Sequence, residues 1–258
     1  MNQNITKAIL PLAALSCVHG KMLAQDAARP NILYIMCDDH AMQAISAYGS
    51  PISKLAPTPN IDRLAQRGML FRNCFVENSL STPSRACLMT GLYSHQNGQR
   101  QLAEGIDTTK TFVPELMQKA GYETGIVGKW HMMCRPKGFD YYYILDGQGK
   151  YYNPNFCTTG NYGKYKQEMG YATTLTTQHA IEFLDHRQKD KPFCLYVHHK
   201  APHRSWFAEP KHIGMYDGVD FPLPKTFWDN YENRGSAAKT QKMNIEKDME
   251  LILDFKIP

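Results

Sequence analysis

The chain has 258 residues, of which 43% are hydrophobic and 21% are charged. This composition excludes a disordered chain, and the length allows one substantial domain with a buried core. The net charge of +5, from 29 Lys and Arg against 24 Asp and Glu, includes no basic run interleaved with aromatic residues, which argues against a nucleic-acid-binding protein. A mildly basic surface instead favours anionic substrates, and sulfated glycans are one such class.

The start of the chain has the features of an export signal. Lys7 precedes an apolar run over residues 8–18, and small residues follow the run. The run is shorter than the about 20 residues of a membrane-spanning helix. We therefore expect a signal peptide over residues 1–24, no membrane span, and a mature chain over residues 25–258 that is exported to the periplasm. Cys17 ends a segment that resembles a lipoprotein signal, so a lipid anchor at this residue is an alternative.

The other cysteines are scattered along the chain, and none forms a Cys-x-x-Cys pair. Thiols placed in this way inside apolar segments are more typical of buried cysteines than of a zinc site or a disulfide framework. An export signal permits disulfides, but the sequence assigns no pairs. These residues are Cys37, Cys74, Cys87, Cys134, Cys157 and Cys194.

The first predicted strand ends in two carboxylates. Residues 31–37 form a short apolar run that is followed by Asp38 and Asp39. This is the pattern of a buried strand with polar residues at its carboxyl end, which is where open α/β sheets bind ligands. Residues 61–68 then predict a short helix that a glycine ends, and the apolar run over residues 69–76 predicts a strand.

A helix followed by a strand is predicted twice more. Residues 111–120 predict a helix and residues 123–130 a strand, and the same order follows over residues 176–186 and 193–198. The alternation predicts an α/β fold with a mostly parallel sheet and helices on both faces. Residues 141–165 are rich in Tyr, Gly and Asn without periodicity, so we expect a long surface excursion near the site. Its aromatic side chains either stack on sugar rings or pack the loop onto the domain.

Polar residues at the ends of these strands are candidates for chemistry. The carboxylates of Asp38 and Asp39 suit a hard cation such as Ca²⁺ or Mg²⁺, although such a pair after a strand is by itself more often a turn with a helix cap. Lys129 and His131 are two positions apart at the end of a predicted strand, so their side chains point the same way if the extended conformation continues. Two cationic donors on one side suit a sulfate group.

Residues 81–91 read Ser-Thr-Pro-Ser-Arg-Ala-Cys-Leu-Met-Thr-Gly. Ser84 and Arg85 open a predicted helix, so Ser81 lies near a helix N-terminus, whose free N–H groups favour an anion. An ordinary helix cap with a solvent-facing Arg is the alternative. A Ser hydroxyl is a weak nucleophile at neutral pH and needs activation by a base, a metal or a modification.

Several segments, in the expected order, resemble the motifs of the formylglycine-dependent sulfatases, a family of the alkaline phosphatase superfamily. The resemblance extends from Pro30 to the last residue, and it is closest to the bacterial N-acetylglucosamine-6-O-sulfatases. It implies an alkaline-phosphatase-like sulfatase domain. The segments are residues 31–39, 58–68, 81–91, 128–131 and 201–203.

The resemblance implies that a maturase of the anaerobic type, which accepts Ser, converts Ser81 to formylglycine. One hydroxyl of the aldehyde hydrate would attack sulfur, and the other would later expel sulfate. It further implies that Arg85 holds the hydrate, that Lys129 binds sulfate, and that His131 is the base that helps the hemiacetal collapse. His203 would contact sulfate or protonate the leaving alcohol.

The resemblance also implies one metal ion, Ca²⁺ rather than Mg²⁺, bound by Asp38, Asp39 and the modified Ser81. The implied substrate is a sulfated glycan. Residues 138–154 look most like the branch that removes the 6-O-sulfate of N-acetylglucosamine in heparan sulfate or mucin-type glycans. Nothing in the sequence indicates the oligomeric state.

Family members are considerably longer and supply further site residues: an Asp followed by Asn, His or Gln, and a second sulfate-binding Lys. Neither is found here, because Asp229 and Asn230 lie in a Pro- and aromatic-rich stretch and residues 244–255 have helix-like apolar spacing. Ca²⁺ would lack many of its about six to eight oxygen ligands. We therefore expect the N-terminal part of a sulfatase catalytic domain. The alternatives are a non-catalytic remnant or glycan-binding fragment, and a phosphatase or phosphonate hydrolase of the same superfamily.

Overall fold

The computed structural model of the protein describes residues 29–256. The expected signal peptide over residues 1–24 and the alternative lipid anchor at Cys17 lie outside the described residues. Among residues 29–256, no helix combines the length and the apolar character that crossing a membrane requires.

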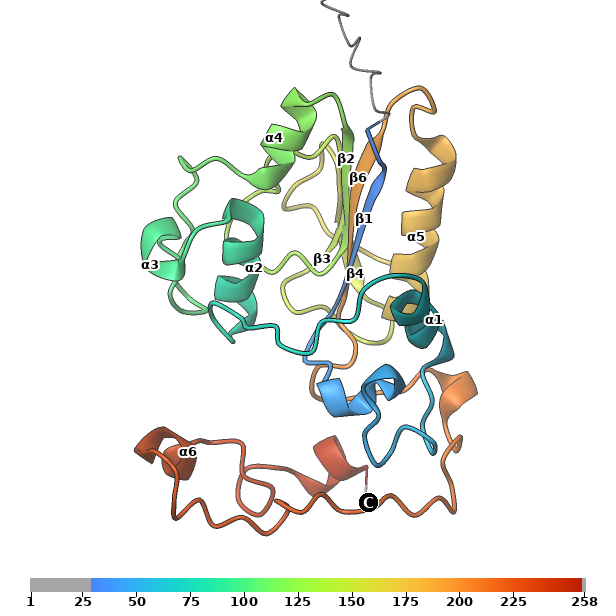
Figure 1. The fold of residues 1–258 in the computed structure, drawn as a ribbon. Helices are drawn as coiled ribbons and strands as arrows, with labels where there is room; N and C mark the ends of the chain where they lie inside the picture. Colours follow the sequence, from blue (N-terminus) through green and yellow to red (C-terminus); the bar gives the residue numbers. More distant parts are fainter. Residues whose placement is uncertain (1–28, 257–258) are drawn as a thin grey trace, which may run out of the picture. The chain divides into compact units, whose positions relative to one another are not determined.

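A six-stranded sheet with the order β1-β6-β2-β3-β4-β5 forms the centre of the fold (Figure 1). The first four strands in this order are parallel, and β4 and β5 are added antiparallel at one edge. The predicted α/β fold with a mostly parallel sheet is confirmed. The strands are β1 (Ile32–Cys37), β2 (Glu123–Gly128), β3 (Tyr141–Leu145), β4 (Asn155–Thr158), β5 (Lys166–Gln167) and β6 (Phe193–His199).

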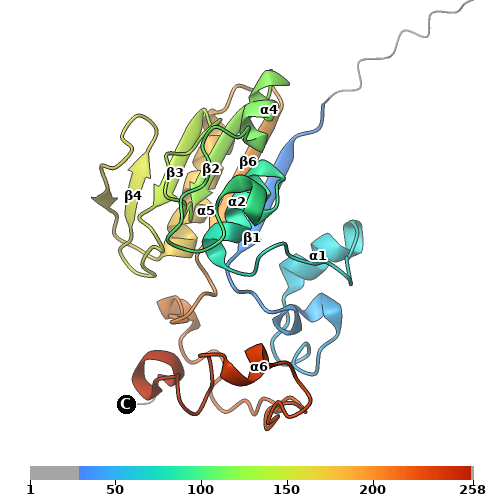
Figure 2. The ribbon, with the colours of Figure 1, turned by 90° about the vertical axis from the view of Figure 1, so that its left-hand side faces the viewer.

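Helices cover both faces of the sheet, as predicted. Helix α5 packs on β2 and β6, while α2 and α4 lie on the opposite side (Figure 1). In the view turned by 90°, α2 stands in front of the strands and α5 behind them (Figure 2). The helices are α1 (Pro59–Arg67), α2 (Ser81–Thr90), α3 (Ser94–Asn97), α4 (Val113–Lys119), α5 (Ala172–His186) and α6 (Ser236–Thr240), with short 3₁₀ turns at Met42–Ala44, Ser46–Tyr48 and Pro210–His212 and a π turn at Leu251–Phe255.

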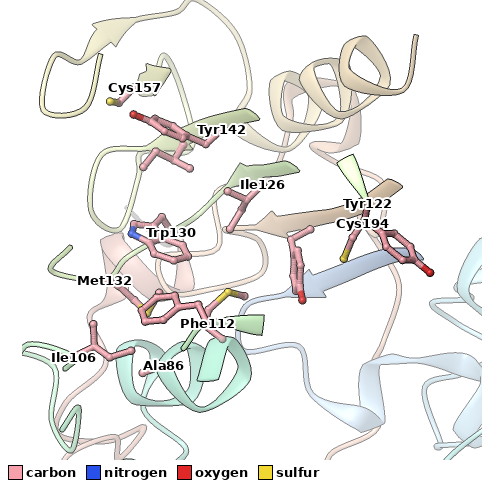
Figure 3. Packing of buried hydrophobic residues seen from close by; sticks show 13 residues of the cluster. Ala86, Ile106, Phe112, Tyr122, Ile126, Trp130, Met132, Tyr142, Cys157 and Cys194 are labelled. Carbon is pink, nitrogen blue, oxygen red and sulfur yellow. The ribbon is translucent and has the colours of Figure 1, made fainter. Parts of the chain in front are cut away.

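The main core lies between α2 and the sheet. Ile126 of β2, Tyr142 of β3 and Trp130 pack with Ala86 of α2 and with Phe112 (Figure 3). A second cluster joins α5 to the same strands on the other face. Apolar contacts on both faces therefore fix β2 in place, and with it the polar residues that follow its carboxyl end.

Two sequence predictions for the connecting segments are wrong. Residues 69–76 form no strand but a surface loop, in which Phe75 is 90% exposed. No described strand pairs with this run, so its apolar character does not produce a sheet. The expected excursion over residues 141–165 contains β3 and β4, because buried Tyr142 and Phe156 face the core and the two strands pair with each other.

Strand β1 has the predicted position but not the predicted burial. Leu33 and Ile35 are 48% and 53% exposed. The reason is that β1 is the edge strand of the described sheet and pairs on one side only, with β6. Some predicted boundaries also shift: the strand expected over residues 123–130 ends at Gly128, and the helix expected over residues 176–186 begins at Ala172. The segment 244–255, which has helix-like apolar spacing, forms only one π turn.

The described cysteines are all free thiols, and no disulfide links residues within 29–256. Cys87, Cys157 and Cys194 are buried, as the sequence indicates for scattered thiols in apolar segments. Cys37 and Cys134 are half-buried, and Cys74 is exposed because it lies in the loop that was expected to be a strand.

Candidate active site

The carboxyl ends of three neighbouring parallel strands carry most of the polar residues selected from the sequence. Two backbone hydrogen bonds tie these strand ends together: the N–H of Asp38 donates to the carbonyl of Ala201 at 3.1 Å, and the N–H of Lys129 donates to the carbonyl of His198 at 2.7 Å. The residues that follow β1, β2 and β6 are Asp38, Asp39, Lys129, His131 and His203.

Ser81 is the first residue of α2, at the positive end of the helix dipole. Its hydroxyl oxygen lies 3.1 Å from Nδ1 of His131 and accepts a hydrogen bond of 3.3 Å from Nε of Arg85. Arg85 is one turn further along the helix, so its side chain shares a face with Ser81. The expected place of Ser81 near a helix N-terminus is confirmed, and its oxygen lies between a cation and an imidazole.

The guanidinium of Arg85 is buried, with 1% of the residue exposed, so the alternative of a solvent-facing Arg is wrong. Its Nη1 donates to the carbonyl of Lys129 at 2.7 Å and lies 3.0 Å from Nδ1 of His198. Its Nη2 lies 3.7 Å from a carboxylate oxygen of Asp38 and has no hydrogen-bond partner among the described residues. A buried donor without an acceptor is costly, so Arg85 is poised for an oxygen-bearing ligand.

Lys129 is fully buried, and its ammonium group donates to Asp38 and to the side-chain oxygen of Gln148. Burial disfavours the charged form and lowers the pKa of Lys129 to about 8, while the hydrogen bond and charge of Asp38 act in the opposite direction. Asp38 is therefore the shared counter-charge of Lys129 and Arg85.

Replacing Asp38 by Asn should destabilise the fold by about 3 kcal/mol, because it leaves two buried cations without their acid partner. Urea unfolding measured without added metal checks this value. The matched control is Glu104→Gln, which breaks the exposed pair with Arg100 and should leave the urea midpoint unchanged, because water screens such a pair. Equal effects of the two substitutions would contradict the shared role of Asp38.

His131 lies beside the Ser81 hydroxyl in a form that can accept a proton. Burial first, and then the charges of Lys129 and Arg85, lower the pKa of His131 to about 4. The ring is therefore neutral at neutral pH, which corrects the expectation of two cationic donors on one side. His203 instead faces the other carboxylate, with Nε2 at 3.7 Å from Oδ2 of Asp39.

The extended conformation does not continue past β2, although the sequence prediction that Lys129 and His131 point the same way depended on it. The strand ends at Gly128, whose φ is +95°, and His131 has a φ of +50°. The two side chains nevertheless reach the same site, Lys129 toward Asp38 and His131 toward Ser81. The two side chains converge because the backbone turns after Gly128. They do not converge because residues two positions apart in a strand point the same way.

The carboxylates of Asp38 and Asp39 are donors of the type that a hard cation prefers. Within residues 29–256, however, no group of three or more His, Cys, Asp or Glu side chains is placed to hold a metal ion. Asp229 pairs with Arg234 at 2.6 Å, which agrees with the interpretation that it is not a ligand. The described residues thus fit a hard cation in donor type alone.

The sequence of this chain is similar to those of known proteins over most of its length. Residues 30–244 match the sequence model of the Sulfatase family. This match covers well over half of the chain, and the chain belongs to the sulfatase family.

Two relatives and one solved structure show which sulfatases the chain is similar to. The chain is 44% identical to the N-acetylglucosamine-6-O-sulfatase of Bacteroides thetaiotaomicron over 100% of its own length and 46% of the relative. It is 31% identical to human N-acetylgalactosamine-6-sulfatase, over 88% of this chain and 47% of that protein. A solved structure in complex with its substrate D-glucosamine-2-N,6-O-disulfate has a TM-score of 0.83 at 46% identity, covering 88% of this chain and 46% of that one. The chain thus spans about half the length of these proteins.

Three residues near the site were not selected from the sequence. Gln148 contacts Lys129 from the segment expected to be a surface excursion, and His198 lies buried behind Arg85. Lys200 follows β6 and is 7% exposed. The position of His198 and Lys200 at a strand end pointed toward the site. Gln148 lies in the segment that was expected near the site, but nothing in the sequence distinguished it from its neighbours there.

Proposed function

We propose that this chain carries the nucleophile of a sulfatase that removes the 6-O-sulfate from N-acetylglucosamine in a sulfated glycan. The observation that carries the proposal is the position of the Ser81 oxygen between the guanidinium of Arg85 and the neutral ring of His131. The sugar is suggested by the relative at 44% identity, which is an N-acetylglucosamine-6-O-sulfatase. The substrate of the similar solved structure also carries a 6-O-sulfate.

Conversion of Ser81 to formylglycine would supply an aldehyde hydrate, with one hydroxyl to attack sulfur and a second to expel sulfate, so that water never has to attack the sulfated intermediate. Arg85 would orient the hydroxyl that it already contacts as a donor. His131 would accept the proton released when the remaining hydroxyl expels sulfate, since its ring is neutral at neutral pH. These roles use the contacts of the side chains as they stand.

The buried cations and the second histidine would handle the substrate. Lys129 would bind a sulfate oxygen, giving up part of its contact with Asp38. His203 would contact sulfate or give a proton to the leaving sugar oxygen, because it lies at the more open side of the site near Asp39. Neither role requires a change in the course of the backbone.

A divalent cation would complete this arrangement. Asp38, Asp39 and the modified Ser81 would hold Ca²⁺, or less favourably Mg²⁺, with the remaining ligands coming from outside the described residues. Bound there, the ion would neutralise sulfate oxygens and favour the deprotonated hydrate.

The proposed biological setting follows from the same chemistry. A maturase of the anaerobic type would modify Ser81, because the residue is Ser rather than Cys. The apolar run over residues 8–18 suggests export to the periplasm, with a lipid anchor at Cys17 as the alternative. The partner substrate would be a sulfated glycan met outside the cytosol.

The second candidate is a non-catalytic fragment that still binds glycan, because Nη2 of buried Arg85, which has no hydrogen-bond partner among the described residues, suits a sulfate group whether or not Ser81 is modified. Coexpression of the chain with an anaerobic-type maturase separates the two. Trypsin releases residues 73–85, and modification makes this peptide lighter by one hydrogen molecule. A modified peptide together with sulfate release from N-acetylglucosamine-6-sulfate supports the sulfatase, whereas a modified peptide without release supports the fragment. An unmodified peptide contradicts the proposed mechanism.

A further inference from the structure

A pocket of about 340 Å³ lies beside the candidate active site, between the segment after β3 and the segment after β6. We call it the Lys200 pocket. Its lining includes two lysines and three aromatic side chains: Lys150, Lys200, Tyr151, Tyr152 and Phe207. None of these residues has a role in the proposed sulfate chemistry.

The aromatic wall of the Lys200 pocket is held in place by hydrogen bonds to backbone carbonyls. The hydroxyl of Tyr151 donates to the carbonyl of His203, and the hydroxyl of Tyr152 donates to that of Ala208. The Tyr171 hydroxyl donates to the carbonyl of Phe207 at 2.7 Å. Side chains that are fixed before a ligand arrives lose little entropy on binding, which suits stacking against a sugar ring.

Lys200 is a buried cation without an acid partner. It is 7% exposed, and among residues 29–256 its ammonium makes no ion pair or hydrogen bond; its one contact of this kind is with the ring of Tyr151, whose centroid is 5.0 Å away. Two other cations nearby each have a carboxylate partner, Asp38 for Lys129 and, at 2.6 Å, Asp254 for Arg204. The carboxylates of Asp38 and Asp39 act on this charge only from a distance. A buried charge that no counter-charge contacts is costly, so its retention points to an anionic ligand.

The Lys200 pocket shares its wall with the candidate active site. Gly149 of the pocket follows Gln148, which contacts the ammonium of Lys129. Tyr151 is joined to His203 through the backbone carbonyl of that residue. The pocket and the candidate active site are therefore joined through residues 148–151 and through the backbone of His203.

We propose that the Lys200 pocket binds a second anionic substituent of the glycan, with Lys200 as its counter-charge and the tyrosines as a stacking surface. The inference rests on the proposed function, because it places the first sulfate at Ser81. Two substituents are anions that the ammonium of Lys200 could bind: an N-sulfate on the same sugar and a carboxylate on the adjoining sugar. The burial of the ammonium makes its contribution specific, since an exposed Lys such as Lys150 is screened by water.

Isothermal titration of the full chain tests the proposal with three ligands: N-acetylglucosamine-6-sulfate, glucosamine-2-N,6-O-disulfate, and a disaccharide of N-acetylglucosamine-6-sulfate with a uronic acid. At least one doubly charged ligand should bind more tightly than the singly charged one. Lys200→Met should remove about tenfold or more of that preference. Lys200→Arg should keep it, and Lys164→Met, which removes an exposed charge, should leave it unchanged.

The identity of the preferred ligand shows which anionic substituent the pocket binds. Tighter binding of the disulfate indicates the N-sulfate, and tighter binding of the disaccharide indicates the carboxylate. Lys200→Met should also keep or raise the melting temperature, since it removes a buried charge that no carboxylate contacts. A preference that survives Lys200→Met overturns the inference, as does an equal loss for all three ligands with a lower melting temperature. If the Ser81 peptide is unmodified while the preference for a doubly charged ligand is intact, only the proposed function is contradicted.

Discussion

Replacing Ser81 by Ala should reduce sulfate release from N-acetylglucosamine-6-sulfate to the background rate. Ala has no oxygen to oxidise and none for Arg85 and His131 to contact, so the loss should be about a millionfold, as for the removal of other nucleophiles that act as part of a unit. Sulfate release by protein coexpressed with the maturase measures the effect. The variant should keep the melting temperature of the parent within a few degrees, because the Ser81 hydroxyl fills no core space.

The matched control is Ser84→Ala, which removes a hydroxyl from the same helix that makes no side-chain hydrogen bond among the described residues. It should keep sulfate release, provided that the mass of its 73–85 peptide shows Ser81 modified. If Ser81→Ala hydrolysed the sulfate ester at the parental rate, Ser81 would not be the nucleophile. Equal losses in both variants would indicate damage to α2 rather than to the chemistry.

Much of the site was predictable because its residues lie in short local patterns. Asp38 directly follows an apolar run that becomes β1, and Ser81 begins the helix that its own segment predicts. Parallel strands bring such segments to one edge of the sheet, whatever their distance in sequence. The alternation of helix and strand therefore predicted Asp38 and Lys129 at strand ends, whereas the place of Arg85 in the site was implied only by the resemblance to sulfatases.

The rest depended on partners that are distant in the sequence. Gln148 reaches Lys129 because β3 and β4 form an antiparallel extension of the sheet, and a Tyr-rich segment without periodicity carries no sign of that pairing. The exposure of Ile35 follows from the position of β1 at the edge of the described sheet, which an apolar run does not reveal. The low pKa of His131 likewise arises from burial and from cations on other elements.

Replacing Gly128 by Ala should prevent the chain from folding. An added Cβ would lie 2.1 Å from the carbonyl oxygen of His198 and 2.9 Å from a methyl carbon of Thr176. The carbonyl cannot retreat, because it accepts the N–H of Lys129 at 2.7 Å and belongs to a strand paired on both sides. The φ of +95° adds further strain for any residue with a side chain.

The cost should exceed about 5 kcal/mol, which is comparable with the whole stability of an ordinary domain. Soluble yield, far-ultraviolet circular dichroism and urea unfolding measure it. Gly105→Ala is the control, since an added Cβ there meets nothing within 4 Å, and it should change the free energy of unfolding by less than about 1 kcal/mol. A folded Gly128→Ala protein with the parental urea midpoint would mean that β2 and β6 do not approach so closely where Lys129 enters the site, and the contact of Lys129 with Asp38 would lose its structural basis.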